Sequence, residues 1–146
     1  MPSISQPFRL CVAFCLLAGA LGCSSATNST TSSAPVDGLV EVTASNFRTL
    51  VLENPQCVLL VFSGENCPPC RQMEPFVKKL ANLHQDKLLV GHVQLENQQS
   101  LANEFQVKVV PTLIVFQKGK VKARDTGGRS LAELENFIAP FVAKAL

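Results

Sequence analysis

The feature that most constrains this chain is an uninterrupted apolar run that leads into two closely spaced cysteines. Residues 57–62 show no alternation of polar and apolar side chains, which predicts a strand buried on both faces, as at the centre of an α/β sheet. Cys67 and Cys70 follow where the pattern becomes helical. This spacing puts one sulfur at the start of a helix and the other one turn inside it, so the pair can close to a disulfide and reopen.

Shorter patterns of both kinds surround this strand. Strands are predicted over residues 39–42, 57–62, 88–95, 112–117 and 120–126, and helices over residues 43–52, 68–83, 99–105 and from 130 onward. Thr43 and Ser130 are expected to cap the first and last helices, and Pro140 to kink or stop the last one. Strands that alternate with helices and end in a hairpin predict an α/β fold, a central mixed sheet flanked by helices on both faces.

The N-terminal residues have the pattern of a signal peptide. Arg9 precedes the apolar and small residues 10–22, a stretch too short to span a bilayer comfortably and of the right length for a signal-peptide core. A buried first helix is the alternative, but residues 24–35 contain no large apolar side chain and would separate it from any core. We therefore predict a signal peptide over 1–22, a flexible tether over 23–38 and one folded domain over 39–146.

The end of the predicted signal peptide bears on location. Residues 20–23, Ala-Leu-Gly-Cys, resemble the lipobox of bacterial lipoproteins, although that family usually has Leu where Ala20 stands. The resemblance implies lipidation of Cys23 and a domain anchored to a membrane on the exported, periplasmic or cell-envelope side. Cleavage after residues 18–20 by an ordinary signal peptidase and a retained anchor are the alternatives.

Export also decides how many thiols remain. Of the six cysteines, the two inside the signal peptide would leave with it and Cys23 would carry lipid. Cys57, Cys67 and Cys70 would then remain in a compartment that usually favours disulfides. Cys57 begins the buried strand and is predicted to pack as a small apolar residue, with a regulatory thiol as the alternative.

Cys67 is the predicted nucleophile. A thiolate in the first helical turn is stabilised by unpaired backbone N–H groups and by the helix dipole, and Cys70 would resolve the mixed disulfide. Pro68 and Pro69 lack N–H groups, which leaves fewer donors for the thiolate. An inert disulfide and a metal site are the alternatives, but zinc sites need further Cys or His ligands at readable spacing, and none follows. No cofactor is expected beyond the redox-active disulfide.

Several separated features, in this order, resemble the thioredoxin superfamily. Phe62 ends the strand before the Cys-x-x-Cys motif and Pro75 lies in the helix after it. Residues 110–112, Val-Pro-Thr, look like the cis-proline loop of that family, and residues 116–120 look like its hairpin. The match runs from residue 39 to the end of the chain, and the loop gives the cysteine motif the context that it lacks alone.

This resemblance implies the thioredoxin fold and a protein-disulfide oxidoreductase. It implies that Pro111 is cis and that the substrate peptide lies against Val110, Pro111 and Thr112. Protein thiols and disulfides would be the substrates, and a membrane redox donor or acceptor would be needed, as for the exported thioredoxins of cytochrome c maturation. We expect a monomer.

The sequence departs from the family at three positions around the dithiol. Asn66 stands in the place of the tryptophan that covers the site, Val61 in that of a buried aspartate, and His92 in that of a lysine. Glu65 and His92 are therefore the nearby candidates for a proton relay. A solvated surface carboxylate is the alternative for Glu65, and a partly buried structural histidine for His92.

Composition excludes one class of function, and two others stay open. Charged residues make up 16% of the chain, the net charge is +2, and the lysines and arginines are not clustered, so nucleic-acid binding is not expected. A thioredoxin-fold binding module would hold a partner on residues 110–112 and keep the disulfide as a staple. A soft-metal carrier would use Cys67 and Cys70 as thiolate ligands.

Overall fold

The computed structural model describes residues 38–143. The predicted signal peptide over 1–22, the lipidation of Cys23 and nearly all of the predicted tether lie outside the described residues. In residues 38–143 there is no helix with the length and the apolar character that crossing a membrane requires.

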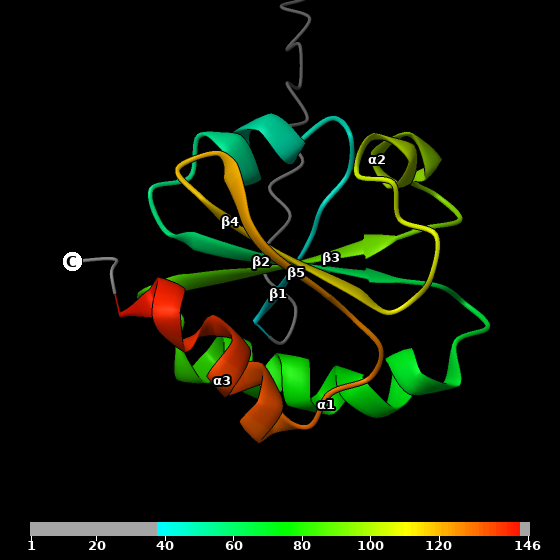
Figure 1. The fold of residues 1–146 in the computed structure, drawn as a ribbon. Helices are drawn as coiled ribbons and strands as arrows, with labels where there is room; N and C mark the ends of the chain where they lie inside the picture. Colours follow the sequence, from blue (N-terminus) through cyan, green and yellow to red (C-terminus); the bar gives the residue numbers. More distant parts are fainter. Residues whose placement is uncertain (1–37, 144–146) are drawn as a thin grey trace, which may run out of the picture. The chain divides into compact units, whose positions relative to one another are not determined.

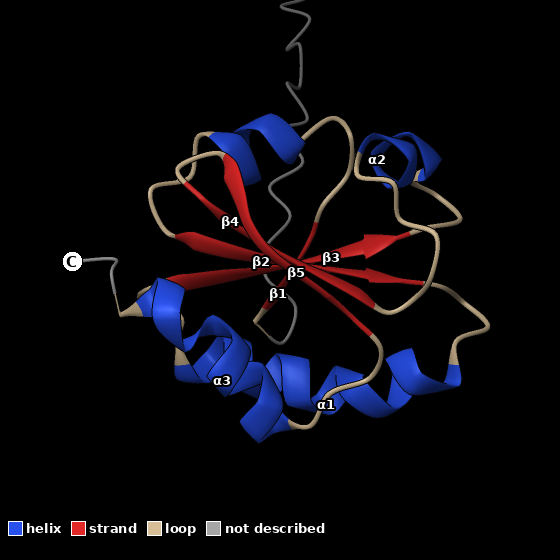
Figure 2. Ribbon diagram, in the orientation of Figure 1, coloured by secondary structure: helices blue, strands red, loops and turns tan. Residues whose placement is uncertain are grey.

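Five strands form one mixed sheet in the order β1-β3-β2-β4-β5 (Figures 1 and 2). They are β1 (Leu39–Glu41), β2 (Cys57–Ser63), β3 (Leu88–Gln94), β4 (Thr112–Gln117) and β5 (Lys120–Thr126). β3 runs parallel to both β1 and β2, whereas β4 is antiparallel to β2 and β5. All five strands lie in the segments predicted for them, and the mixed sheet is confirmed.

Helices cover both faces of this sheet, as predicted (Figure 2). One face carries α1 (Pro68–Leu83) and α3 (Leu131–Val142). The other carries α2 (Gln99–Glu104) and a short π-helical segment, η1 (Arg48–Leu52). The chain therefore has the architecture of the thioredoxin fold.

The central strand β2 divides the core into two layers. Every residue of β2 is buried, which confirms the reading of its unbroken apolar pattern. Leu59 and Val61 pack toward α1 and α3, while Leu60 and Phe62 pack toward η1 and α2. Burial on both faces fixes β2 firmly, and the segment that follows it carries the two cysteines.

The prediction of a helix over residues 43–52 capped by Thr43 is confirmed at its end and wrong at its start. Arg48–Leu52 form η1 after the helical residue Phe47, and residues 44–46 form a turn in which the N–H of Phe47 donates to the carbonyl of Thr43 at 2.9 Å. The Asn46 side chain accepts a hydrogen bond from the N–H of Thr43 at 2.8 Å, and the Thr43 hydroxyl contacts that of Ser45 at 2.8 Å. These side-chain contacts accompany the turn that leads into η1, and the helical hydrogen bond from Phe47 to Thr43 is retained.

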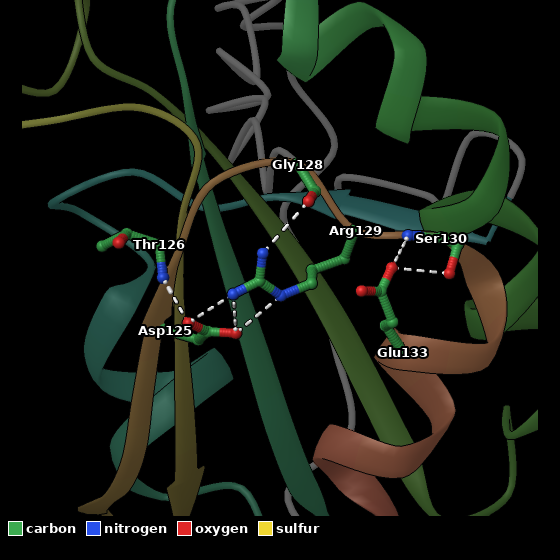
Figure 3. A network of polar contacts seen from close by, with 6 residues as sticks. All are labelled: Asp125, Thr126, Gly128, Arg129, Ser130 and Glu133. Atoms are coloured by element: carbon green, nitrogen blue, oxygen red, sulfur yellow. Dashed lines mark hydrogen bonds and ion pairs between the residues drawn. The ribbon is translucent and has the colours of Figure 1, made fainter.

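The prediction for the last helix is confirmed at its start. Ser130 precedes α3 and donates from its N–H and its hydroxyl to the Glu133 carboxylate, at 2.8 and 2.6 Å (Figure 3), an arrangement typical of a capping box. α3 continues through Pro140 to Val142, so the proline does not stop the helix.

Candidate active site

The two cysteines lie where β2 leads into α1. Cys67 is the N-cap residue of α1, and its sulfur is bonded to that of Cys70 with the two Cα atoms 5.2 Å apart. The backbone N–H of Cys70 donates to the Cys67 sulfur at 3.2 Å. Because Pro68 and Pro69 have no N–H group, this amide is the donor that the first turn offers to a thiolate at Cys67.

The disulfide is mostly covered, and its neighbours are not. Cys67 is 4% and Cys70 7% exposed, while Pro68 and Pro69 between them are exposed.

The loop before β4 lies beside this motif. The Val110–Pro111 peptide bond is cis, as the resemblance implied. A Cβ atom on Gly64, which follows β2, would stand 3.5 Å from Val110 Cγ2. Thr112 is buried and its hydroxyl donates to the carbonyl of Val109 at 2.6 Å. The structure thus brings the predicted substrate-binding residues next to the segment that carries the dithiol.

A second loop, after β5, lies beside the Cys67–Cys70 motif and the cis-proline loop. The N–H of Gly127 donates to the carbonyl of Pro111 at 2.9 Å, and a Cβ atom on Gly128 would stand 3.5 Å from Pro69 Cβ. Asp125 and Arg129 close this loop through two hydrogen bonds of 2.8 Å, one from Nε and one from Nη2 (Figure 3). Sequence reasoning took the two glycines only as the end of the sheet and missed this ion pair.

Glu96 is a further residue that sequence reasoning missed. Its carboxylate accepts from the N–H of Glu65 at 2.9 Å and from the side-chain amide of Gln94 at 2.8 Å. The Glu65 N–H lowers the pKa of the Glu96 carboxyl. On the other side, the Glu65 carbonyl accepts from Arg71 at 3.1 Å. Glu96 and Arg71 thus hold the loop between β2 and Cys67 from two sides.

Of the two proton-relay candidates, only His92 lies partly buried in the sheet. Glu65 is exposed. His92 on β3 is in register with Val61 and Glu41, and burial lowers its pKa, an effect that the charges of Glu74 and Glu41 oppose. Glu74 belongs to α1, so His92 faces the helix that carries the dithiol.

Cys57 packs in the core, as predicted. It is fully buried at the start of β2, and burial raises the pKa of its thiol to about 11. Within residues 38–143, no three His, Cys, Asp or Glu side chains are grouped so that they could hold a metal ion.

Comparison with known proteins agrees with this geometry. The family model described as Thioredoxin matches residues 38–140. A thioredoxin of Acidithiobacillus ferridurans is 29% identical over 102 residues, which cover 70% of this chain and 94% of that protein. A thioredoxin of Buchnera aphidicola subsp. Schizaphis graminum is 30% identical over 100 residues, 68% of this chain and 93% of that protein. Protein disulfide-isomerase 2-3 of Arabidopsis thaliana is 34% identical over 104 residues, 70% of this chain but 24% of the isomerase.

Proposed function

This chain belongs to the thioredoxin family and is a thiol-disulfide oxidoreductase, and we propose that it exchanges disulfides with protein substrates through Cys67 and Cys70 in an exported compartment. The observation that carries the proposal is the placement of this pair. The nucleophile candidate begins α1, and the cis-proline loop and the Gly127–Gly128 loop lie beside it.

In the reductive direction, the reaction takes place in two steps. The Cys67 thiolate attacks one sulfur of a substrate disulfide, and the other substrate sulfur leaves as a thiolate that takes up a proton. Cys70 then loses its proton and attacks the Cys67 sulfur. The substrate leaves as a dithiol, the enzyme is left with the Cys67–Cys70 disulfide, and a dithiol donor must reduce it before the next turnover. Oxidation of a substrate is the same sequence in reverse.

For the proton of Cys70, His92 is the better of the two candidates. A neutral imidazole can accept a proton, and burial keeps the pKa of His92 below its usual value. Its electrostatic partner Glu74 is on the same helix as Cys70. Glu65, by contrast, is exposed and is held through its backbone, so its carboxylate is left to tune charge around the site.

Reduction of insulin by dithiothreitol tests this function. The wild-type protein should accelerate the reaction, Cys67→Ser should abolish the acceleration, and Cys57→Ala, which changes the buried thiol outside the site, should retain it. Cys70→Ser should accumulate a mixed disulfide with its substrate. An unchanged rate in Cys67→Ser would reject the oxidoreductase mechanism at this pair and favour a binding module, which would still hold its partner. Metal bound to reduced protein purified without chelator would favour the soft-metal carrier.

Export and anchoring rest on residues 10–23, and we propose lipidation at Cys23 with the folded domain held near a membrane. A cell that produces the chain should incorporate labelled fatty acid into it, and Cys23→Ser should remove the label. Label retained in Cys23→Ser would reject lipidation at this residue. A soluble exported product without label would instead indicate ordinary cleavage after residues 18–20.

A further inference from the structure

The strand directions define two ends of the folded unit. β2 ends and α1 begins at the active-site end, where Thr112 also starts β4. The turn at Lys118 and Gly119 joins β4 to β5 at the opposite end. The chain enters β1 at that end too, since a Cβ atom on Gly38 would stand 3.3 Å from Cβ of Ala81, close to the C-terminus of α1. We call this the basal end (Figure 1).

Three lysines meet at the basal end. Lys118, Lys120 and Lys122, together with Gln117, line a hollow at the β4–β5 turn, and all three lysines are exposed. Within the described residues none of them forms an ion pair. The hollow is therefore a concentration of uncompensated positive charge.

Apolar side chains are also exposed near this turn. Val121 of β5 is 51% exposed and Leu52 is 41% exposed, and the Leu52 carbonyl oxygen is 2.7 Å from the position of a Cβ atom on Gly119. Glu53, the next residue, is already paired with Arg48 at 2.8 Å. Lysines on an edge strand often serve to prevent pairing with another strand. Protection of the edge does not explain why apolar residues are exposed near the same turn. Apolar groups with lysines around them are typical of surfaces that meet anionic lipid.

The active-site end carries charges of both signs. Glu65 and Glu96 lie on its loops and are exposed, and Arg71 and Lys108 are exposed there as well.

We propose that the basal patch, formed by Leu52, Lys118, Lys120, Val121 and Lys122, docks on anionic phospholipid headgroups, so that the dithiol faces away from the membrane. The docking itself needs only the charges and the apolar residues of the patch. It is independent of the redox reaction.

Vesicle binding tests the proposal with a charge-matched pair of variants. Lys118→Gln/Lys120→Gln removes two basal charges, and Lys79→Gln/Lys108→Gln removes two exposed charges elsewhere. Full-length chain is used throughout, so the apolar residues 10–22 contribute equally. A lysine near an anionic surface strengthens binding about fivefold, so the basal variant should bind vesicles containing phosphatidylglycerol about tenfold or more weakly. The control variant should bind like wild type, and phosphatidylcholine vesicles should not distinguish the three. Equal weakening of both variants would overturn the proposal.

Acetylation of lysines on vesicle-bound protein gives a second readout. Phosphatidylglycerol vesicles should protect Lys118 and Lys120 relative to Lys108 on the same molecule, and the protection should fall as salt screens the surface. Equal protection of all three lysines would overturn the proposal. So would protection by inorganic phosphate alone with none by the vesicles, which would mark a site for free phosphate. The basal variant should still reduce insulin in solution, so failure of docking and failure of the proposed reaction are separate results.

Discussion

Arg129 holds Asp125 through a two-point ion pair, with Nε and Nη2 each 2.8 Å from a different carboxylate oxygen. The pair spans Gly127 and Gly128, the residues that contact Pro111 and Pro69. A planar guanidinium fixes the geometry of such a pair more closely than a lysine does. The pair therefore sets the position of the loop beside the dithiol, although neither side chain belongs to the reacting pair.

Arg129→Lys should weaken the use of protein substrates and spare small ones. The variant keeps the charge but loses the two-point contact, so the loop becomes less ordered where a substrate peptide would lie. We expect KM for insulin to rise severalfold, with an unchanged rate toward a low-molecular-weight disulfide. With both side chains about a third exposed, the loss of stability should be about 1 kcal/mol or less. Arg48→Lys, in the exposed pair with Glu53 at the basal end, is the control. Equal losses toward both substrates would contradict this role.

The contact between Glu96 and Glu65 predicts a titration. The Glu65 N–H lowers the pKa of the Glu96 carboxyl from 4.5, so the contact contributes stability above pH 4.5 that is lost as pH falls through the lower, folded value. In Glu65→Gln, which removes the carboxyl group of residue 65 but keeps its N–H, the amide proton resonance of residue 65 should shift below pH 4.5. Adding Glu96→Gln should abolish the shift, whereas adding Glu104→Gln should not. A resonance that still titrates without Glu96 would contradict the contact.

Sequence patterns predicted most of the fold because the strands are defined by burial. The unbroken apolar run of β2 is visible in the chain itself, and so is the change to helical spacing at Cys67. The cis-proline loop was identified through the family resemblance. The helix predicted over residues 43–52 begins later than its pattern indicates, because residues 44–46 form a turn in which the Asn46 side chain accepts from the N–H of Thr43.

Contacts between separate loops could not be read from the chain. Glu96 is distant in sequence from Glu65, and its partner is a backbone N–H, which has no residue type to recognise. The basal lysines were judged unclustered, although they alternate within residues 118–122; what the chain does not show is that Leu52, from another segment, lies at the same turn. Contacts of this kind depend on how strands, helices and loops are placed relative to one another. The residue pattern within one segment does not show that placement.

Close packing at Gly91 predicts a destabilising substitution. A Cβ atom there would lie 2.7 Å from Leu60 Cδ2 and 2.7 Å from Val42 Cγ2, both in the buried core. Gly91→Ala should therefore lower the free energy of unfolding by about 1–3 kcal/mol, the usual effect of overpacking, measured by urea denaturation. Gly128→Ala, whose nearest atom is 3.5 Å away, should change it little. Equal effects would mean that the core adjusts freely around residue 91.

The buried thiol of Cys57 should be unreactive. With its pKa raised to about 11, it stays protonated at pH 8, and the thiolate is the form that alkylates. Iodoacetamide should label Cys67 in the reduced native protein but Cys57 only after denaturation, as peptide mapping by mass spectrometry can show. Labelling of both at similar rates in native protein would favour the alternative of a regulatory thiol.

His92 should make stability depend on pH near neutrality. Burial lowers its pKa in the folded protein from 6.5, so below that pH the unfolded chain binds a proton that the folded protein does not. The free energy of unfolding should then decrease as pH falls from 7 toward 5, less steeply than burial alone implies because Glu74 and Glu41 favour the charged form. Urea unfolding at both pH values should show a smaller decrease in His92→Gln than in wild type or in the control His84→Gln. An unchanged decrease in His92→Gln would mean that other groups cause it.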